Sequence, residues 1–143
     1  MDVAAILREK GTKVITAYPD ATVAQIVSIL NRERVGVVII CEKDGGLAGI
    51  ISERDVVRGL AESNQGILRT PVAGLMTTDV RTCAPGDKVS EIMATMTAKH
   101  IRHIPVIESG KLCGIISIGD VVKHRLDEIE SEADALRDYV ASA

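Results

Sequence analysis

Apolar positions along the chain change their period in a fixed order. After Thr22, apolar residues recur at the i, i+3, i+4, i+7 spacing that is typical of a core-facing helix. These residues are Val23, Ile26, Val27 and Leu30. Two β-branched runs follow, from 35 to 41 and through Ile51, and the turn signal Asp44-Gly45-Gly46 between them predicts a hairpin. Ser52, with Asp55 three positions on, then opens another helix.

The same order occurs a second time. The segment that begins at Arg81 aligns with the segment that begins at Ile15 at an offset of 66, which becomes 65 after the hairpin turn, where the second repeat is one residue shorter. The helix pattern recurs at Val89, Ile92, Met93 and Met96. The hairpin recurs from His103 to Ile116, with Ser109-Gly110 as its turn, and the helix start recurs at Ser117 with Asp120. We therefore predict an α/β fold of two repeats, each a three-stranded sheet flanked by helices, related by pseudo-twofold symmetry.

The repeats set the expected domain boundaries. We assign residues 1–66 to the first repeat, 67–128 to the second and 129–143 to a helical extension. The polar stretch from Glu62 to Thr70, before Pro71, is predicted to be the linker. Each small sheet must cover its apolar face, so the two repeats should pack against each other.

Four helix starts carry side chains that can cap them. Thr22 with Gln25 forms a capping-box pattern, and Asp87 with Ser90 is a looser start. Ser52 with Asp55 and Ser117 with Asp120 have the spacing of reciprocal capping boxes, which need no ligand. Capping is therefore a sufficient explanation of both Ser-x-x-Asp pairs from spacing alone.

The end of the chain predicts a helix longer than one domain requires. Apolar residues spaced 4, 3, 4, 3 and 4 form a continuous stripe: Val122, Leu126, Ile129, Ala133, Leu136 and Val140. The opposite face carries mostly charged residues, and a membrane-surface helix would need basic residues there. We expect the stripe to join two copies of the chain in a homodimer, with folding back onto its own domain as the alternative.

Composition narrows the function. The 143 residues have a net charge of −3 and only 1% aromatic residues, so base stacking and a basic nucleic-acid groove are both disfavoured. No signal sequence and no membrane span are expected. Cys41, Cys83 and Cys113 are too far apart for a metal site and suit buried positions in a reducing compartment, so we expect a cytoplasmic protein without a metal.

The ordered set of motifs resembles a tandem pair of cystathionine-β-synthase (CBS) domains, also called a Bateman module. The resemblance rests on Gly-Ile-Ile-Ser-x-x-Asp-Val-Val at 49–57 and 114–122, on Leu75-Met76-Thr77, and on 100–106. It implies a regulatory sensor that takes part in signal transduction and binds AMP, ADP, ATP, NAD or S-adenosylmethionine between the repeats, with AMP preferred. It also implies a homodimer, with an effector protein as a further partner.

The resemblance assigns roles to particular residues. The carboxylates of Asp55 and Asp120, beside Ser52 and Ser117, would accept hydrogen bonds from the ribose hydroxyls. Arg102 and His103 would contact phosphate. The strands 35–39 and 104–106, which include Ile104 and Pro105, would provide an apolar slot for the adenine. Strand alternation predicts that these two basic side chains lie on opposite faces unless a bulge redirects them.

Further positions are less specific, and the two sites differ. Thr16 and Thr82 match family positions whose hydroxyl contacts phosphate or ribose, and Arg54 could join a phosphate cluster. The first repeat has Gly36 and Val37 in place of the two basic residues, so we expect two unequal sites.

No nucleophile with an adjacent base is visible, and we expect no enzyme. A dimerisation module with an empty cleft, an S-adenosylmethionine sensor and a nucleotide hydrolase are the alternatives.

Overall fold

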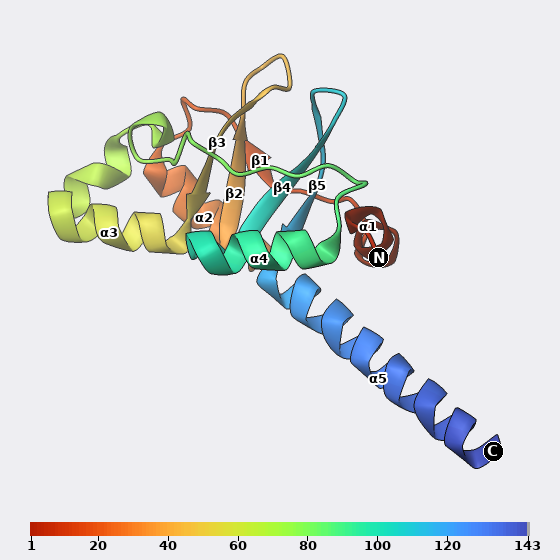
Figure 1. The fold of residues 1–143 in the computed structure, drawn as a ribbon. Coiled ribbons are helices and arrows are strands. Elements are labelled where there is room, and N and C mark those ends of the chain that lie inside the picture. The colour runs from red at the N-terminus through yellow and green to blue at the C-terminus, as the bar shows by residue number, and fades with distance from the viewer. Residues whose placement is uncertain (143) are drawn as a thin grey trace.

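The computed structural model describes residues 1–142 and contains two α/β units side by side (Figure 1). The first unit consists of β1 (Thr16–Ala17), α2 (Val23–Glu33), β2 (Val37–Cys41), β3 (Leu47–Ser52) and α3 (Glu53–Ser63). The second consists of α4 (Val89–Lys99), β4 (His103–Glu108), β5 (Lys111–Ser117) and α5 (Ile118–Ser142). Helix α1 (Val3–Lys10) precedes them, and the short 3₁₀ helices η1 (Asn64–Arg69) and η2 (Val72–Gly74) lie between them. The predicted α/β repeat fold is confirmed.

The two sheets differ by one strand. The first has the order β1-β2-β3, with β1 parallel to β2 and β2 antiparallel to β3. In the second, β4 and β5 are antiparallel and the expected third strand is reduced to one bridge between Cys83 and Val106. The Ile39 N–H donates to the Ile15 carbonyl, but its counterpart Pro105 has no N–H to donate. The prediction of three strands in the second repeat is therefore wrong.

Side-chain caps form at three of the four predicted helix starts. Thr22 and Gln25 make a reciprocal capping box, as do Ser52 and Asp55. At α5 the Ser117 N–H donates to Asp120 Oδ2 at 2.8 Å, and the Asp120 N–H donates to Ser117 Oγ at 3.1 Å. The predicted start at Asp87 with Ser90 is wrong: α4 has no side-chain cap, because Asp87 Oδ2 instead accepts from the Ala84 N–H of the preceding turn.

Two aliphatic cores are formed, and each takes a segment from outside its own repeat. The core of the second repeat includes Val3, Ile6 and Leu7 of α1. The core of the first repeat includes Val72, with Ile67, Leu68, Leu75 and Met76 packed against it. The segment before each repeat thus completes the core of the other one.

Matching backbone hydrogen bonds hold the two exchanged segments. The Val3 N–H donates to the Asp87 carbonyl, and the Val72 N–H donates to the equivalent Ala21 carbonyl. The Ala4 and Ala73 N–H groups donate to the carbonyls of Pro85 and Pro19 in the same way. These paired contacts show the predicted pseudo-twofold relation.

The segment between the repeats is more ordered than its composition indicates. The prediction of a linker from Glu62 to Thr70 is wrong, because α3 continues to Ser63 and η1 then packs its apolar side chains on the first core. Helix α1 was not predicted at all, although Asp2 caps it and its buried residues have helical spacing. Of the three unpaired cysteines, Cys83 is buried and the other two are half-buried.

Helix α5 leaves the body of the molecule and projects away from it (Figure 1). Its first turns pack on the second core through Val121 and His124, and the predicted extension 129–143 continues the same helix. Leu126, Leu136 and Val140 are 59%, 64% and 65% exposed, so the alternative in which the stripe folds back is wrong. Within residues 1–142, no helix combines the length and apolar character needed to span a membrane.

The exchange of segments predicts an asymmetry between two equivalent glycines. A Cβ at Gly49 would lie 2.7 Å from the Thr77 carbonyl oxygen, whereas a Cβ at Gly114 would meet only the movable Leu7 side chain. We expect Gly49→Ala to lower the free energy of unfolding by about 1–3 kcal/mol and the control Gly114→Ala by clearly less. Urea denaturation measures both, and equal losses would contradict this account of the packing.

Candidate functional site

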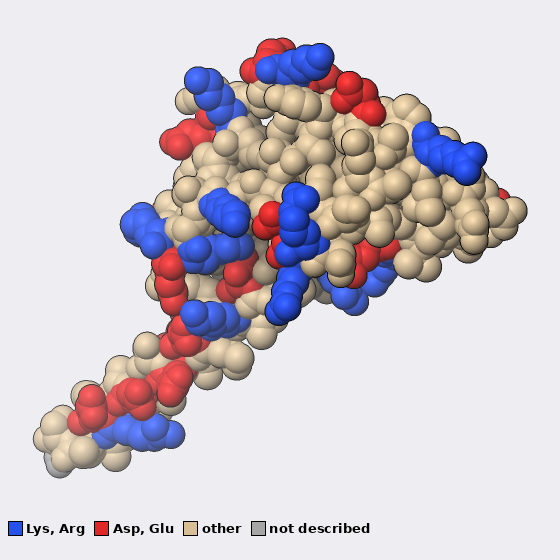
Figure 2. All heavy atoms as spheres, turned by 180° about the vertical axis from the view of Figure 1, so that it is seen from behind, with Lys and Arg blue, Asp and Glu red and all other residues tan. Residues whose placement is uncertain are grey.

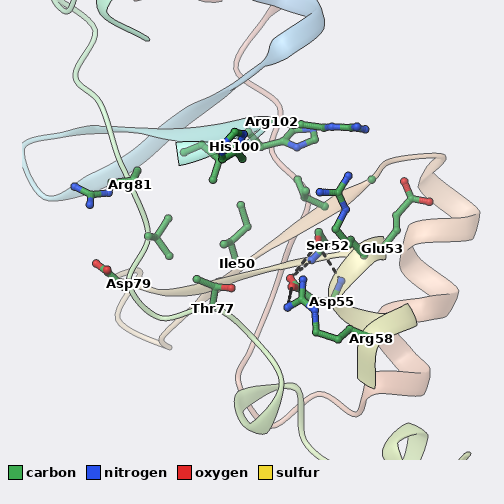
Figure 3. Close-up of a pocket in the computed structure, with 16 residues that line it drawn as sticks. Ile50, Ser52, Glu53, Asp55, Arg58, Thr77, Asp79, Arg81, His100 and Arg102 are labelled. Atoms are coloured by element: carbon green, nitrogen blue, oxygen red, sulfur yellow. Dashed lines mark hydrogen bonds and ion pairs between the residues drawn. The ribbon is translucent and has the colours of Figure 1, made fainter. Parts of the chain in front are cut away.

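A cleft with a volume of about 350 Å³ lies between the two repeats, and we call it cleft A. The first repeat contributes the start of α3, and the second contributes the residues before and at the start of β4 (Figure 3). Its lining consists of Gly36, Val37, Ile50, 52–55, Arg58, Thr77, 79–81 and 100–103. Cleft A therefore brings together a helix start of one repeat and a strand entrance of the other.

A second cleft of about 340 Å³, cleft B, occupies the pseudo-symmetric position. Its lining consists of Lys10, 13–15, 34–37, Ile39, His103, Ile115 and Ser117. In the alignment of the two repeats, Lys13 corresponds to Asp79, Arg34 to His100 and Ser117 to Ser52. The molecule thus has two related clefts with different side chains.

Asp55 lies at the start of α3 and faces cleft A. Its Oδ2 atom accepts hydrogen bonds from the Ser52 N–H at 2.9 Å and from the Ser52 hydroxyl at 3.0 Å (Figure 3). Its Oδ1 atom has only an ion pair with Arg58 at 3.5 Å, and the Arg58 side chain is 60% exposed. One carboxylate oxygen thus caps the helix while the other is available to a ligand, so capping and ribose binding are compatible.

Asp120, the counterpart of Asp55, is engaged by α1. Lys10 Nζ donates to Asp120 Oδ2 at 2.6 Å and to the Ile115 carbonyl at 2.9 Å. Burial alone would raise the pKa of Asp120, but the hydrogen bonds from Lys10 and Ser117 outweigh burial and hold the pKa below its usual value. Both donors contact the Oδ2 atom, so a ligand that used Asp120 would share this carboxylate with Lys10.

Basic side chains converge on cleft A. Its lining includes four arginines and two histidines against three carboxylates. The arginines are Arg54, Arg58, Arg81 and Arg102. Arginine presents a planar fork of donors that matches phosphate oxygens, so this arrangement suits an anionic ligand.

Arg102 and His103 both line cleft A, although strand alternation predicted opposite faces. Strand β4 begins only at His103, so Arg102 lies before the pleat and is exposed. His103 also lines cleft B. Burial and the nearby Lys10 charge lower the pKa of His103, and the carboxylates of Asp120 and Glu53 oppose this only in part.

The structure separates the predicted site residues into three groups. Ser52, Arg54, Asp55, Arg102 and His103 meet in cleft A. Ser117 lines cleft B beside the Lys10–Asp120 pair. Asp120 itself and four further residues line neither cleft: Thr16 and Thr82 are exposed, and Ile104 and Pro105 are buried in β4.

Several lining residues were missed by the sequence analysis. Thr77 and Arg81 reach cleft A from the segment between η2 and α4, and Arg58 reaches it from the second turn of α3. Lys10 and Lys13 have the corresponding place in cleft B. The alignment of the two repeats was the signal that could have revealed these residues, because it gives Lys13 of cleft B and Asp79 of cleft A equivalent positions.

Comparison with known proteins identifies this class of paired α/β repeats. The CBS domain profile matches residues 3–62 and 72–127, and the chain belongs to the CBS-domain family. It is 32% identical to the mitochondrial CBS domain-containing protein CBSX3 of Arabidopsis thaliana, over 94% of this chain and 69% of that protein.

Solved structures show the same arrangement. The CBS-domain protein ATU1752 of Agrobacterium tumefaciens has 38% identity and a TM-score of 0.85, covering 87% of this chain and 99% of that one. The fold is also that of the CBS domain protein PAE2072 of Pyrobaculum aerophilum, solved in complex with AMP, at 24% identity and a TM-score of 0.75. The latter alignment covers 84% of this chain and 89% of that one.

The Lys10–Asp120 pair predicts a pH-dependent contribution to stability. We expect Lys10→Met to raise the pKa of Asp120, as followed by NMR titration of the carboxyl group. A lowered carboxyl pKa stabilises the fold above the unfolded-state value and loses this effect as the pH falls through the folded-state value. The stability of Lys10→Met should therefore be lower than that of the wild type at pH 7 and converge with it in strong acid.

Lys13→Met is the matched control for this experiment. It removes the same charge from the same segment, but Lys13 is 82% exposed and lies 3.9 Å from Glu33. An unchanged pKa of Asp120 in Lys10→Met would show that the ion pair does not form in solution.

Proposed function

We propose that this chain is a regulatory sensor module that binds an adenosine nucleotide, with AMP preferred, in cleft A. The observation that carries the proposal is the meeting of Asp55 and Arg102 in one cleft from opposite repeats. The Asp55 carboxylate would accept both ribose hydroxyls, and Arg102 with Arg81 would hold phosphate. The same cleft thus offers partners for both polar parts of a nucleotide.

The base requires an apolar slot. Val37, Ile50, Val80 and Ile101 also line cleft A and supply aliphatic surface between the polar groups. A site that is mainly apolar with a few placed polar groups is typical of small-molecule binding. The AMP complex of a protein with the same fold supports an adenosine ligand, and ADP, ATP, NAD and S-adenosylmethionine are the competitors that the test must include.

Regulation fits this site better than catalysis. A ligand between the repeats would contact both and change how they sit against each other. We further propose that the module acts as a cytoplasmic homodimer that passes this change to an effector protein. The reducing cytoplasm suits three unpaired cysteines.

The proposal predicts stabilisation by ligand. At 100 times its dissociation constant a ligand adds about 2.7 kcal/mol. For a domain of this size that raises the melting midpoint by roughly 5–10 °C. We expect millimolar AMP to produce this shift, measured by differential scanning fluorimetry against the four competitors. If none of the five ligands moves the midpoint, the sensor proposal fails and a dimerisation module without nucleotide is favoured.

Asp55→Asn tests which cleft holds the nucleotide. The substitution keeps the size and the capping oxygen but removes a charge-assisted hydrogen bond worth roughly 1.5–3 kcal/mol. We expect the affinity for AMP to fall about tenfold to a hundredfold by calorimetry, with little change in the melting midpoint of the free protein.

Two further variants complete this test. Asp120→Asn makes the same change at the equivalent helix start, beside cleft B, and should affect AMP binding less, because Lys10 already pairs with that carboxylate. Asp127→Asn, on the exposed face of α5, controls for net charge. A larger loss of affinity in Asp120→Asn would move the nucleotide to cleft B.

A further inference from the structure

The projecting part of α5 carries a surface that nothing in the described chain covers. The six stripe residues run along one side of the helix from Val122 to Val140. Five of them are 46% to 65% exposed, and the sixth is Ala133. Contiguous apolar patches of this kind are rare on soluble monomers. The stripe therefore needs a partner, and the charges beside it indicate which one.

The stripe has the heptad spacing of a two-stranded coiled coil. In heptad notation Leu126, Ala133 and Val140 occupy a positions, and Val122, Ile129 and Leu136 occupy d positions. Residues at e and g flank such a seam and decide partner and orientation through their charges. Here the charged flanking residues are Lys123, Arg125, Glu130, Glu132 and Arg137.

A parallel pair of these helices places opposite charges together. In that arrangement each g residue faces the next e residue of the second copy. Arg125 then faces Glu130 of the second copy, and Glu132 faces Arg137 of the second copy. Twofold symmetry repeats both contacts, so the parallel pair has four opposite-charge contacts and no like-charge contact between these residues.

An antiparallel pair places like charges together. In antiparallel coils e residues face e residues and g residues face g residues. In the register that pairs all six stripe residues, Glu130 faces Glu130 and Glu132 faces Glu132. Lys123 faces Arg137 in the same register. Every charged contact is then repulsive, so the sequence of α5 disfavours this orientation.

The four side chains that the parallel coil pairs are available for intermolecular contacts, whereas Lys123 pairs with Glu9 of its own chain at 3.0 Å. Acidic and basic side chains mix along the projecting helix (Figure 2). Arg125 and Arg137 make exposed ion pairs with Glu128 and Asp134 at 3.0 Å, and such pairs contribute little. Within residues 1–142, Glu130 and Glu132 make no ion pair.

We propose that residues 122–142 of two copies form a parallel two-stranded coiled coil that holds both modules at the same end. The inference rests on the proposed homodimer and specifies its contact surface and orientation. It does not depend on which ligand cleft A binds.

A cysteine at the centre of the seam reports the orientation directly. In the parallel coil Ala133 faces Ala133 of the second copy, so Ala133→Cys should form an intermolecular disulfide under mild oxidation. In the antiparallel register Ala133 faces Ile129. Ser131→Cys places the thiol on the outer face of the same helix and is the matched control. The expected result is a covalent dimer for Ala133→Cys, above the level seen in the wild type and in Ser131→Cys.

Charge reversal tests the flanking contacts. Glu130→Lys places like charges opposite Arg125 twice in the parallel coil and should raise the dimer dissociation constant about tenfold by sedimentation. Asp127→Lys makes the same charge change on the outer face and should leave the constant nearly unchanged. Adding Arg125→Glu to Glu130→Lys should restore dimerisation, because the pair is then opposite in charge again.

The outcomes separate the two proposals. A full-length chain that sediments as a 15.2 kDa monomer at micromolar concentration overturns both the homodimer and the coil. A dimer that neither links through Ala133→Cys nor responds to Glu130→Lys overturns the coil alone. So does a dimer that persists unchanged when residues 129–143 are deleted. The melting shift with AMP tests the sensor proposal independently of these results.

Discussion

The exchange of segments between the two repeats is the constraint on which the rest of the structure depends. Helix α1 completes the second core and the segment around Val72 completes the first. Separating the repeats would expose two aliphatic cores, and burial of such surface is the main favourable term in folding. The repeats are therefore held as one unit, and each cleft is lined by both of them. A nucleotide in cleft A would bridge parts of the chain that the exchange already ties together.

The two clefts differ because the exchanged segments differ in length. Their hydrogen bonds align Val3 with Val72, whereas the repeats align Ile15 with Arg81, so the first segment is three residues longer. The extra turn extends α1 to Lys10, which reaches Asp120. Within residues 1–142, Asp55 pairs with no lysine, and its Oδ1 atom lies 3.5 Å from Arg58 of its own helix. One additional helical turn thus places a lysine against the carboxylate of the second repeat, whereas the carboxylate of the first repeat pairs with an arginine of its own helix.

Most of the local structure could be predicted from the sequence, whereas the exchange of segments between the repeats could not. The repeat order, the hairpins, three of the four caps and the long final helix follow from periodicity and capping patterns, which are local. That Asp55 of one repeat shares a cleft with Arg102 of the other depends on the pseudo-twofold packing, about which the spacing within one repeat contains no information. The short second sheet did have a local cause in Pro105, which removes one ladder hydrogen bond.

The central claim is that one nucleotide contacts both repeats in cleft A. A crystal structure of the chain with AMP tests it most directly, because it locates the ribose and the phosphate separately. The account predicts the ribose hydroxyls at the Asp55 carboxylate of the first repeat and the phosphate at Arg102 of the second. AMP bound against a single repeat, or with its ribose at Asp120 and Lys10 displaced, would contradict it.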